Sequence, residues 1–248
     1  MYKVEICANS VESCLAAQEG GAHRVELCAG ISEGGTTPSY GEIVTARELL
    51  HIKLHVIIRP RGGDFLYNET EIKIMERDIR LAKETGVDGV VFGCLTPTGE
   101  IDVLLTKRLI RAAEGLSITF HRAFDQCSQP MQALEQLIEL GCDRLLTSGQ
   151  QPTAEKGIPL LKELVDKATD RIIILPGSGI NENNILHIAQ ETQAKEFHFS
   201  ARESQNSRML YKNSNVSINS ASVPNDYTQY TTTAYRVRKT IEALHATT

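Results

Sequence analysis

The sequence predicts a (β/α)8 barrel, the TIM-barrel fold of the α/β class, as a single domain over residues 1–248. Short β-like apolar runs alternate strictly with amphipathic helical stretches, the pattern of a parallel sheet built from right-handed crossovers. The chain has 248 residues, and about eight such units in a chain of this size favour a closed barrel. An open doubly wound sheet is the alternative, because sequence alone does not show closure.

Eight segments have the short apolar runs expected of strands. They are KVEIC (3–7), HRVELC (23–28), KLHVIIR (53–59), GVVFG (89–93), SITFH (117–121), DRLLTS (143–148), RIIIL (171–175) and EFHFS (196–200). Helical stretches lie between them, at 11–20, 42–50, 69–86, 102–115, 131–141, 155–168 and 181–192, with a final helix near 234–245. Ser39 followed by Glu42 predicts a capping box at the start of the second helix.

One segment departs from this alternation. Residues 204–222 are dominated by Ser and Asn and follow the eighth predicted strand. A loop of this length in a compact domain is usually a lid, a binding arm or a partly disordered segment. A mobile surface loop is an equally good interpretation.

Composition narrows the classes of function. A net charge of −5 gives no basic surface for nucleic acid. No signal peptide is visible at the N-terminus, and no apolar run approaches the ~18–20 residues of a membrane span. The six cysteines are scattered without a CxxC motif, which favours reduced thiols over disulfides. We therefore expect a cytoplasmic protein, with no nucleic acid and no membrane as partners.

Strand alternation predicts which side chains face the barrel interior, since apolar residues must face the helices. In VEIC (4–7) this turns Glu5 and Cys7 inward, and in VELC (25–28) it turns Glu26 and Cys28 inward. The same rule gives a larger inward polar set, which adds His55, Arg59, Thr119, His121, Glu196, His198 and Ser200. Barrel interiors are mostly filled by Val, Ile and Leu, so this set indicates a site. The alternative to a site is a charge network in which these residues only pair with one another.

The two thiols are candidate metal ligands. Adjacent parallel strands lie ~4.8 Å apart, so Cys7 and Cys28 at matching levels come close together. Two soft thiolates suit Cu(I), whereas zinc requires about four ligands, which His121 or His198 would have to complete. Two other interpretations remain open: buried cysteines that act as small hydrophobes, and a pair that oxidises reversibly.

Several loops at the same rim are candidates for binding an anion. Arg59 and Arg61 lie in IIRPRGGDF (57–65) on a glycine-hinged loop. The turn ILPGSGIN (174–181) follows the seventh strand, where barrels often bind phosphate, although such a turn is also an ordinary strand-to-helix connection. The candidate anion-binding residues are Arg59, Arg61, Gly177, Ser178, Gly179, His198 and Ser200. No motif indicates a nucleotide cofactor.

Acid–base candidates lie on the same face. In TFHRAFD (119–125), His121 is a candidate general acid or base, and Asp125 is a candidate to orient it or a substrate. Arg122 is expected to point away and to pair with a neighbouring loop. With Glu5 and Glu26, these residues form the hypothetical catalytic set.

These segments together resemble the CutC copper-homeostasis family. The matching stretches, in family order from residue 4 to about 213, are VEIC, RVELCAG, SEGGTTPSYG, IRPRGGDF, GCLTPTGEID, TFHRAFD, TSGQ, PGSGIN and HFSAR followed by MLYKN. The resemblance implies a TIM barrel, a cytoplasmic location, a homo-oligomer, and copper binding by a pair of pocket cysteines, which match Cys7 and Cys28. The 204–222 loop is longer and richer in Ser and Asn than the family leads us to expect.

Two main hypotheses follow. The first is a copper-homeostasis protein that binds Cu(I) through Cys7 and Cys28. The second is a barrel enzyme, an isomerase, lyase or hydrolase, that acts on a small anionic or phosphorylated substrate. A scaffold that works through oligomer contacts is a third alternative.

Overall fold

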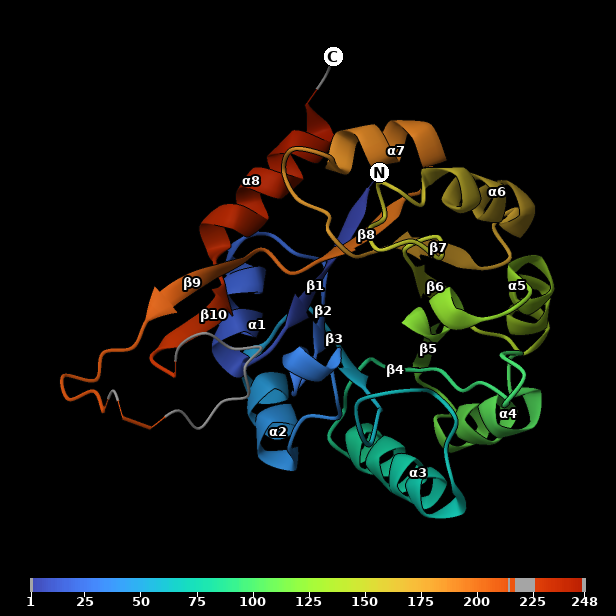
Figure 1. The fold of residues 1–248 in the computed structure, drawn as a ribbon, viewed down its shortest axis with the longest axis horizontal. Coiled ribbons are helices and arrows are strands. Elements are labelled where there is room, and N and C mark those ends of the chain that lie inside the picture. Colours follow the sequence, from blue (N-terminus) through green and yellow to red (C-terminus); the bar gives the residue numbers. More distant parts are fainter. Residues whose placement is uncertain (1, 214, 217–225, 247–248) are drawn as a thin grey trace.

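The chain folds into a nearly closed barrel of eight parallel strands, which confirms the predicted TIM barrel (Figure 1). The structure is a computed structural model, and it describes residues 2–213, 215–216 and 226–246. The barrel strands are β1 (Lys3–Ala8), β2 (Arg24–Leu27), β3 (Lys53–Ile57), β4 (Gly89–Phe92), β5 (Ser117–Phe120), β6 (Arg144–Thr147), β7 (Ile173–Pro176) and β8 (Glu196–Phe199). β1 to β7 pair in parallel in the order of the sequence, and β8 pairs in parallel with β1. A parallel bridge between Gly177 and His198 joins the ends of β7 and β8.

Helices form a ring around the strands (Figure 1). They are α1 (Val11–Glu19), α2 (Tyr40–Leu49), α3 (Glu69–Glu84), α4 (Val103–Ala112), α5 (Pro130–Glu139), α6 (Ile158–Ala168), α7 (Ile185–Thr192) and α8 (Ala234–His245). The capping box predicted at α2 is present: the Ser39 hydroxyl accepts from the Glu42 amide, and the Glu42 carboxylate accepts from the Ser39 amide. Among the described residues, no helix is both long enough and apolar enough to span a membrane.

The apolar core lies between the strands and this helical ring. Val4 and Ile6 of β1 and Val25 and Leu27 of β2 are fully buried there. Because strand side chains alternate, the residues between them face the barrel interior. The predicted inward orientation of Glu5 and Glu26 is confirmed by their contacts, because Glu5 pairs with Arg24 and His198 inside the barrel and Glu26 lies 3.6 Å from His198.

A hairpin follows the eighth barrel strand. Its strands, β9 (Arg202–Asn206) and β10 (Thr228–Thr232), pair antiparallel and extend away from the barrel beside α1 (Figure 1). The sequence prediction of a loop from residue 204 is wrong for residues 204–206, which belong to β9. Thr232 anchors the base of the hairpin, because its amide donates to the Ser13 hydroxyl and its own hydroxyl donates to the Ser200 carbonyl. Residues 214 and 217–222 of the predicted loop lie outside the described residues.

Candidate functional site

A cavity of about 330 Å³ opens at the carboxyl ends of the barrel strands. Catalytic and binding sites of TIM barrels form on this face. Six apolar side chains line part of it: Ile31, Ile57, Phe65, Leu146, Ile180 and Phe199. The polar lining includes Cys7, Glu26, Cys28, Arg59, His121, Arg122, Ser178, His198, Ser200 and Arg202. Most of the residues that the sequence predicted to share a site therefore do meet in one cavity.

The two predicted thiol ligands are adjacent, but the prediction that they lie at matching levels is wrong. In the register of β1 and β2, Cys7 is paired with Glu26, and Cys28 lies two residues further along. The Sγ atoms of Cys7 and Cys28 lie 3.9 Å apart, and no cysteine in the chain forms a disulfide. The hydrogen bond from the Cys28 thiol, together with His198, lowers the pKa of Cys7 well below its ordinary value. The same hydrogen bond raises the pKa of Cys28 well above its ordinary value. Cys7 is thus the thiol that ionises first.

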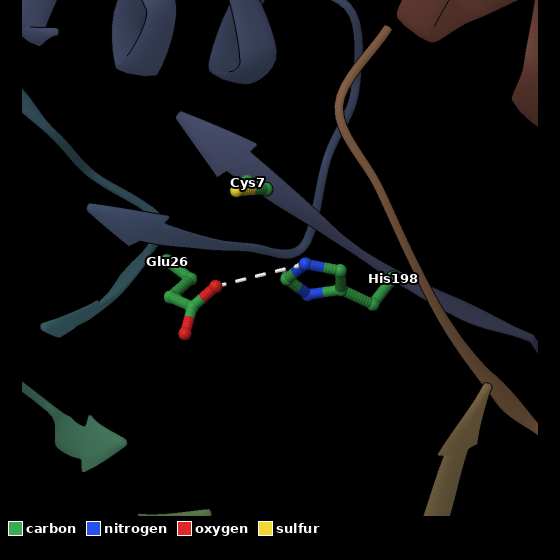
Figure 2. A group of neighbouring side chains, drawn as sticks. All are labelled: Cys7, Glu26 and His198. Carbon is green, nitrogen blue, oxygen red and sulfur yellow. Dashed lines mark ion pairs between the residues drawn. The ribbon is translucent and has the colours of Figure 1, made fainter. Parts of the chain in front are cut away.

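His198 lies beside this pair and is held in place by Glu5. Its Nδ1 is 2.7 Å from a carboxylate oxygen of Glu5, which leaves Nε2 directed toward the cavity. Figure 2 shows the imidazole pointing toward Glu26, with Cys7 beside them. One ligand atom from each of Cys7, Glu26 and His198 lies within 4.8 Å of the others. Burial alone lowers the pKa of His198, but Cys7 and the two carboxylates raise it well above its ordinary value.

Glu26 is the carboxyl group in this cluster that lacks a tight partner. Its Oε2 lies 3.6 Å from Nε2 of His198, and its buried Oε1 has no hydrogen-bond partner among the described residues. Burial raises the pKa of Glu26 to about 8, because His198 offsets only part of the cost of desolvation. Glu26 is therefore a neutral acid near neutral pH.

Glu5 belongs to a charge network beneath the cavity rather than to its lining. Its carboxylate pairs with Arg24, and Arg24 also pairs with Glu196 at 2.8 Å. Arg144 contacts the same oxygen of Glu196, Oε2, at 3.0 Å. Burial would raise the pKa of Glu5, but Arg24 and His198 hold it well below its ordinary value. The charged groups of this lower layer are paired with one another. For Glu5 and Glu196, the structure therefore agrees with the alternative interpretation of an internal charge network.

Arg59 lines the cavity but uses its guanidinium to hold loop backbone. Nη1 donates to the carbonyls of Glu33 and Gly35 at 2.6 and 2.8 Å, and Nη2 donates to the carbonyl of Gly63 at 2.8 Å. The guanidinium also lies 5.0 Å from the centroid of the Phe65 ring. Among the described residues, no carboxylate is within ion-pair distance of Arg59.

His121 also lines the cavity, as a neutral imidazole. Its Nδ1 accepts a hydrogen bond from the Ala123 amide, so the ring proton is on Nε2. That buried Nε2 has no hydrogen-bond partner among the described residues. Burial, together with the nearby Arg59 charge, lowers the pKa of His121 to about 3.

Asp125 does not orient His121. Its carboxylate accepts from the Ser148 amide and hydroxyl and from the Gln150 amide, and it pairs with Arg122. Arg122 also donates to the Ser148 hydroxyl, so it does pair with a neighbouring loop. The prediction that it points away from the site is wrong, because Arg122 lines the cavity. Asp125 therefore ties the 3-10 helix at Arg122–Gln126 to the loop that follows β6.

The remaining anion candidates divide between the cavity and its surroundings. Ser178, Gly179 and Ser200 line the cavity, whereas Gly177 lies just outside its lining. Arg61 points away, since its side chain pairs with Glu71 at 2.6 Å and with Asp64 at 3.0 Å.

Two interior arginines and one at the mouth of the cavity were not predicted from the sequence. Arg24 and Arg144 supply the cations of the lower network, and Arg202 lines the cavity from the base of the hairpin. Strand alternation could have identified Arg24, because Arg24, Glu26 and Cys28 are two residues apart and so face the same side of the strand. Arg202 follows the last barrel strand, and only the path of the hairpin brings it to the cavity.

The fold and the site together define a TIM-barrel protein with a paired-thiol and histidine cluster in its cavity. The chain belongs to the CutC family, whose model matches residues 2–203. It is 63% identical to a family protein CutC from Bacteroides thetaiotaomicron over 244 residues, which is 98% of each chain. It is 46% identical to the human copper homeostasis protein cutC homolog over 237 residues, 96% of this chain and 87% of the human one.

Solved structures agree with this assignment. A crystal structure of CutC from Streptococcus agalactiae matches with a TM-score of 0.78 at 39% identity, over 81% of this chain and 99% of that one. Phosphoribosylanthranilate isomerase from Thermotoga maritima matches with a TM-score of 0.60 over 98% of both chains. Its identity of 14% supports the shared barrel fold alone.

Proposed function

We propose that this chain binds Cu(I) through Cys7 and Cys28, in the copper-handling role after which its relatives are named. The observation that carries the proposal is the 3.9 Å separation of the two Sγ atoms on the wall of an open cavity. Soft thiolates select Cu(I) over hard cations. A reducing cytoplasm, where we place the chain, keeps such thiols free.

We assign His198 as the third ligand. Its Nδ1 is bound to Glu5 at 2.7 Å, so Nε2 is the nitrogen that faces Cys7. A carboxylate that holds the far nitrogen of a ligating histidine is a recurrent feature of metal sites, because it fixes the ring and raises its basicity. This assignment also gives Glu5 a function beyond its ion pair with Arg24. Glu26, a hard oxygen donor, is less suited to Cu(I).

An anaerobic titration of Cu(I) against a competing chelator tests the proposal. We expect one Cu(I) per chain for the wild type and loss of this site in Cys7→Ser/Cys28→Ser. Cys127→Ser is the matched control, because this thiol lies near the amide of Gln150 and outside the cavity lining. Binding by the double variant that is as tight as that of the wild type would overturn the proposal.

A second variant separates the role of His198 from that of the thiols. Glu5→Gln keeps the size of the side chain but removes the carboxylate behind the imidazole. Loss of such a supporting group weakens metal binding by about 10–100-fold, and we expect a decrease in this range. An unchanged affinity would remove His198 from the ligand set and leave the cysteine pair as the proposal.

A further inference from the structure

The cavity has a second polar wall, formed by Arg59 and His121, that the copper site does not use. Cys7 and His198 lie on β1 and β8 and Cys28 follows β2, whereas Arg59 follows β3 and His121 follows β5. In the strand order of the barrel, β5 is four strands from β1, so His121 lies across the cavity from Cys7. Arg59 lies between them along the rim, because β3 is next to β2.

The first observation on this wall is a buried positive charge without a counterion. Arg59 is 4% exposed, and its guanidinium binds three backbone carbonyls but, among the described residues, no carboxylate. A buried charge is costly unless an opposite charge accompanies it. Arg202, a second arginine of the lining, likewise forms no ion pair within the described part of the chain. The cavity is thus electrostatically suited to an anion.

The second observation is a buried donor that lacks an acceptor. His121 is 4% exposed and lines the cavity, and its Nε2 has no partner among the described residues. The Ala123 amide occupies Nδ1, which fixes the proton on Nε2. Leaving a buried N–H unsatisfied is costly, so this group is suited to donate to an oxygen atom of a ligand.

The third observation concerns the shape of the ligand. The Phe65 ring lies 5.0 Å from the His121 ring, centroid to centroid, and equally close to the Arg59 guanidinium. Ile57, Leu146 and Ile180 add apolar surface to the same cavity. A volume of about 330 Å³ is at the lower end of the ~300–1,000 Å³ typical of small-molecule sites. An inorganic anion would leave this apolar lining uncovered.

We propose that the cavity binds a small organic carboxylate, with its negative charge near Arg59, its apolar body against Phe65, and an oxygen atom accepting from Nε2–H of His121. The site does not depend on copper, because none of these three residues belongs to the thiol cluster. The ligand class is a compact carboxylic acid with an apolar body.

Calorimetric titration of the metal-free protein with four probes tests the proposal. The probes are phenylpyruvate, hydrocinnamate, benzylacetone, which lacks the carboxylate, and inorganic phosphate. Ordinary ligand efficiencies give dissociation constants of roughly 1–4 mM for carboxylates of this size. We expect both carboxylates to bind in this range or tighter, and benzylacetone and phosphate to bind at least about tenfold more weakly.

Two variants locate the site. His121→Asn keeps an acceptor for the Ala123 amide but removes the Nε2 donor, and Arg59→Gln removes the charge. We expect each to weaken carboxylate binding at least about tenfold, while Arg111→Gln, on the exposed surface of α4, leaves it unchanged. If Arg59→Gln does not fold, His121→Asn decides the outcome.

Four results would overturn the proposal. Three of them are no carboxylate binding up to about 20 mM, severalfold above the expected dissociation constants, equal binding of carboxylates and benzylacetone, and wild-type affinity in His121→Asn. Tighter binding of phosphate than of either carboxylate would instead assign the wall to an inorganic anion and would also refute the organic ligand. Because the protein is metal-free, none of these results depends on the Cu(I) proposal.

Discussion

Arg24 is expected to be a major source of stability in the barrel interior, and replacing it with Met tests the lower charge network. Its side chain is 6% exposed and joins Glu5 to Glu196. Removing one partner of a buried ion pair costs about 3–5 kcal/mol, because the remaining charge stays buried. Glu5 keeps His198 and Glu196 keeps Arg144. We therefore expect Arg24→Met to lower the free energy of unfolding near pH 8 by roughly 3 kcal/mol, the lower end of this range.

The pH dependence of this loss identifies its cause. In the wild type, the lowered pKa of Glu5 contributes stability that is present above its unfolded value of 4.5 and is lost as pH falls through the folded pKa. Without Arg24 the folded pKa of Glu5 rises, so protonation in mild acid relieves the unpaired charge. We expect the difference in stability between variant and wild type to be smaller at about pH 5 than at about pH 8.

Urea unfolding followed by far-ultraviolet circular dichroism is the suitable assay, since the chain contains no tryptophan. Arg111→Met is the matched control, and as an exposed change it should alter stability by less than about 0.5 kcal/mol. A loss below about 1 kcal/mol for Arg24→Met, or an equal loss at both pH values, would refute the argument that buried charge pairing stabilises this layer.

Three further predictions follow from the same interior. Burial raises the pKa of Glu26 to about 8, so the folded chain retains a proton that the unfolded chain releases above about 4.5, and stability falls as pH rises through this window. Glu26→Gln should therefore match the wild type near pH 5 and exceed it near pH 9 by up to roughly 5 kcal/mol, at about 1.4 kcal/mol per pKa unit; a urea midpoint difference that is independent of pH would contradict this. Gly89→Ala would place a Cβ 2.5 Å from Nε2 of His55 and should cost about 1–3 kcal/mol, whereas Gly41→Ala, which has open space in α2, should be neutral or stabilising in the same unfolding assay. Cys7 should be alkylated by iodoacetamide at neutral pH faster than the other five cysteines, as measured by peptide mass spectrometry, because its pKa is lowered; first reaction at another cysteine would contradict that assignment.

The alternation of β-like runs with helical stretches predicted the fold, and the alternation of side chains along each strand predicted much of the site. Because the outward face of each strand must be apolar, the positions of Val4 and Ile6 placed Glu5 and Cys7 inside, and the second strand placed Glu26 and Cys28 likewise. The inward orientation of Arg24 was not predicted, although Arg24 lies two residues before Glu26 on the same strand.

Contacts made by loops could not be predicted in this way. Arg59 faces the cavity as expected, but its three carbonyl partners depend on the path of the backbone around Gly35 and Gly63. Asp125 was expected beside His121, yet the 3-10 helix that follows β5 turns it toward Ser148. Backbone paths of this kind follow from tertiary packing rather than from a local pattern.

X-ray absorption at the copper edge tests the central claim most directly. Protein loaded anaerobically with one equivalent of Cu(I) should have a coordination shell dominated by sulfur from Cys7 and Cys28, with a nitrogen contribution from His198. The sulfur contribution should disappear in Cys7→Ser/Cys28→Ser and persist in Cys127→Ser. A shell of nitrogen and oxygen alone in the wild type, or a sulfur shell that survives in the double variant, would contradict the account.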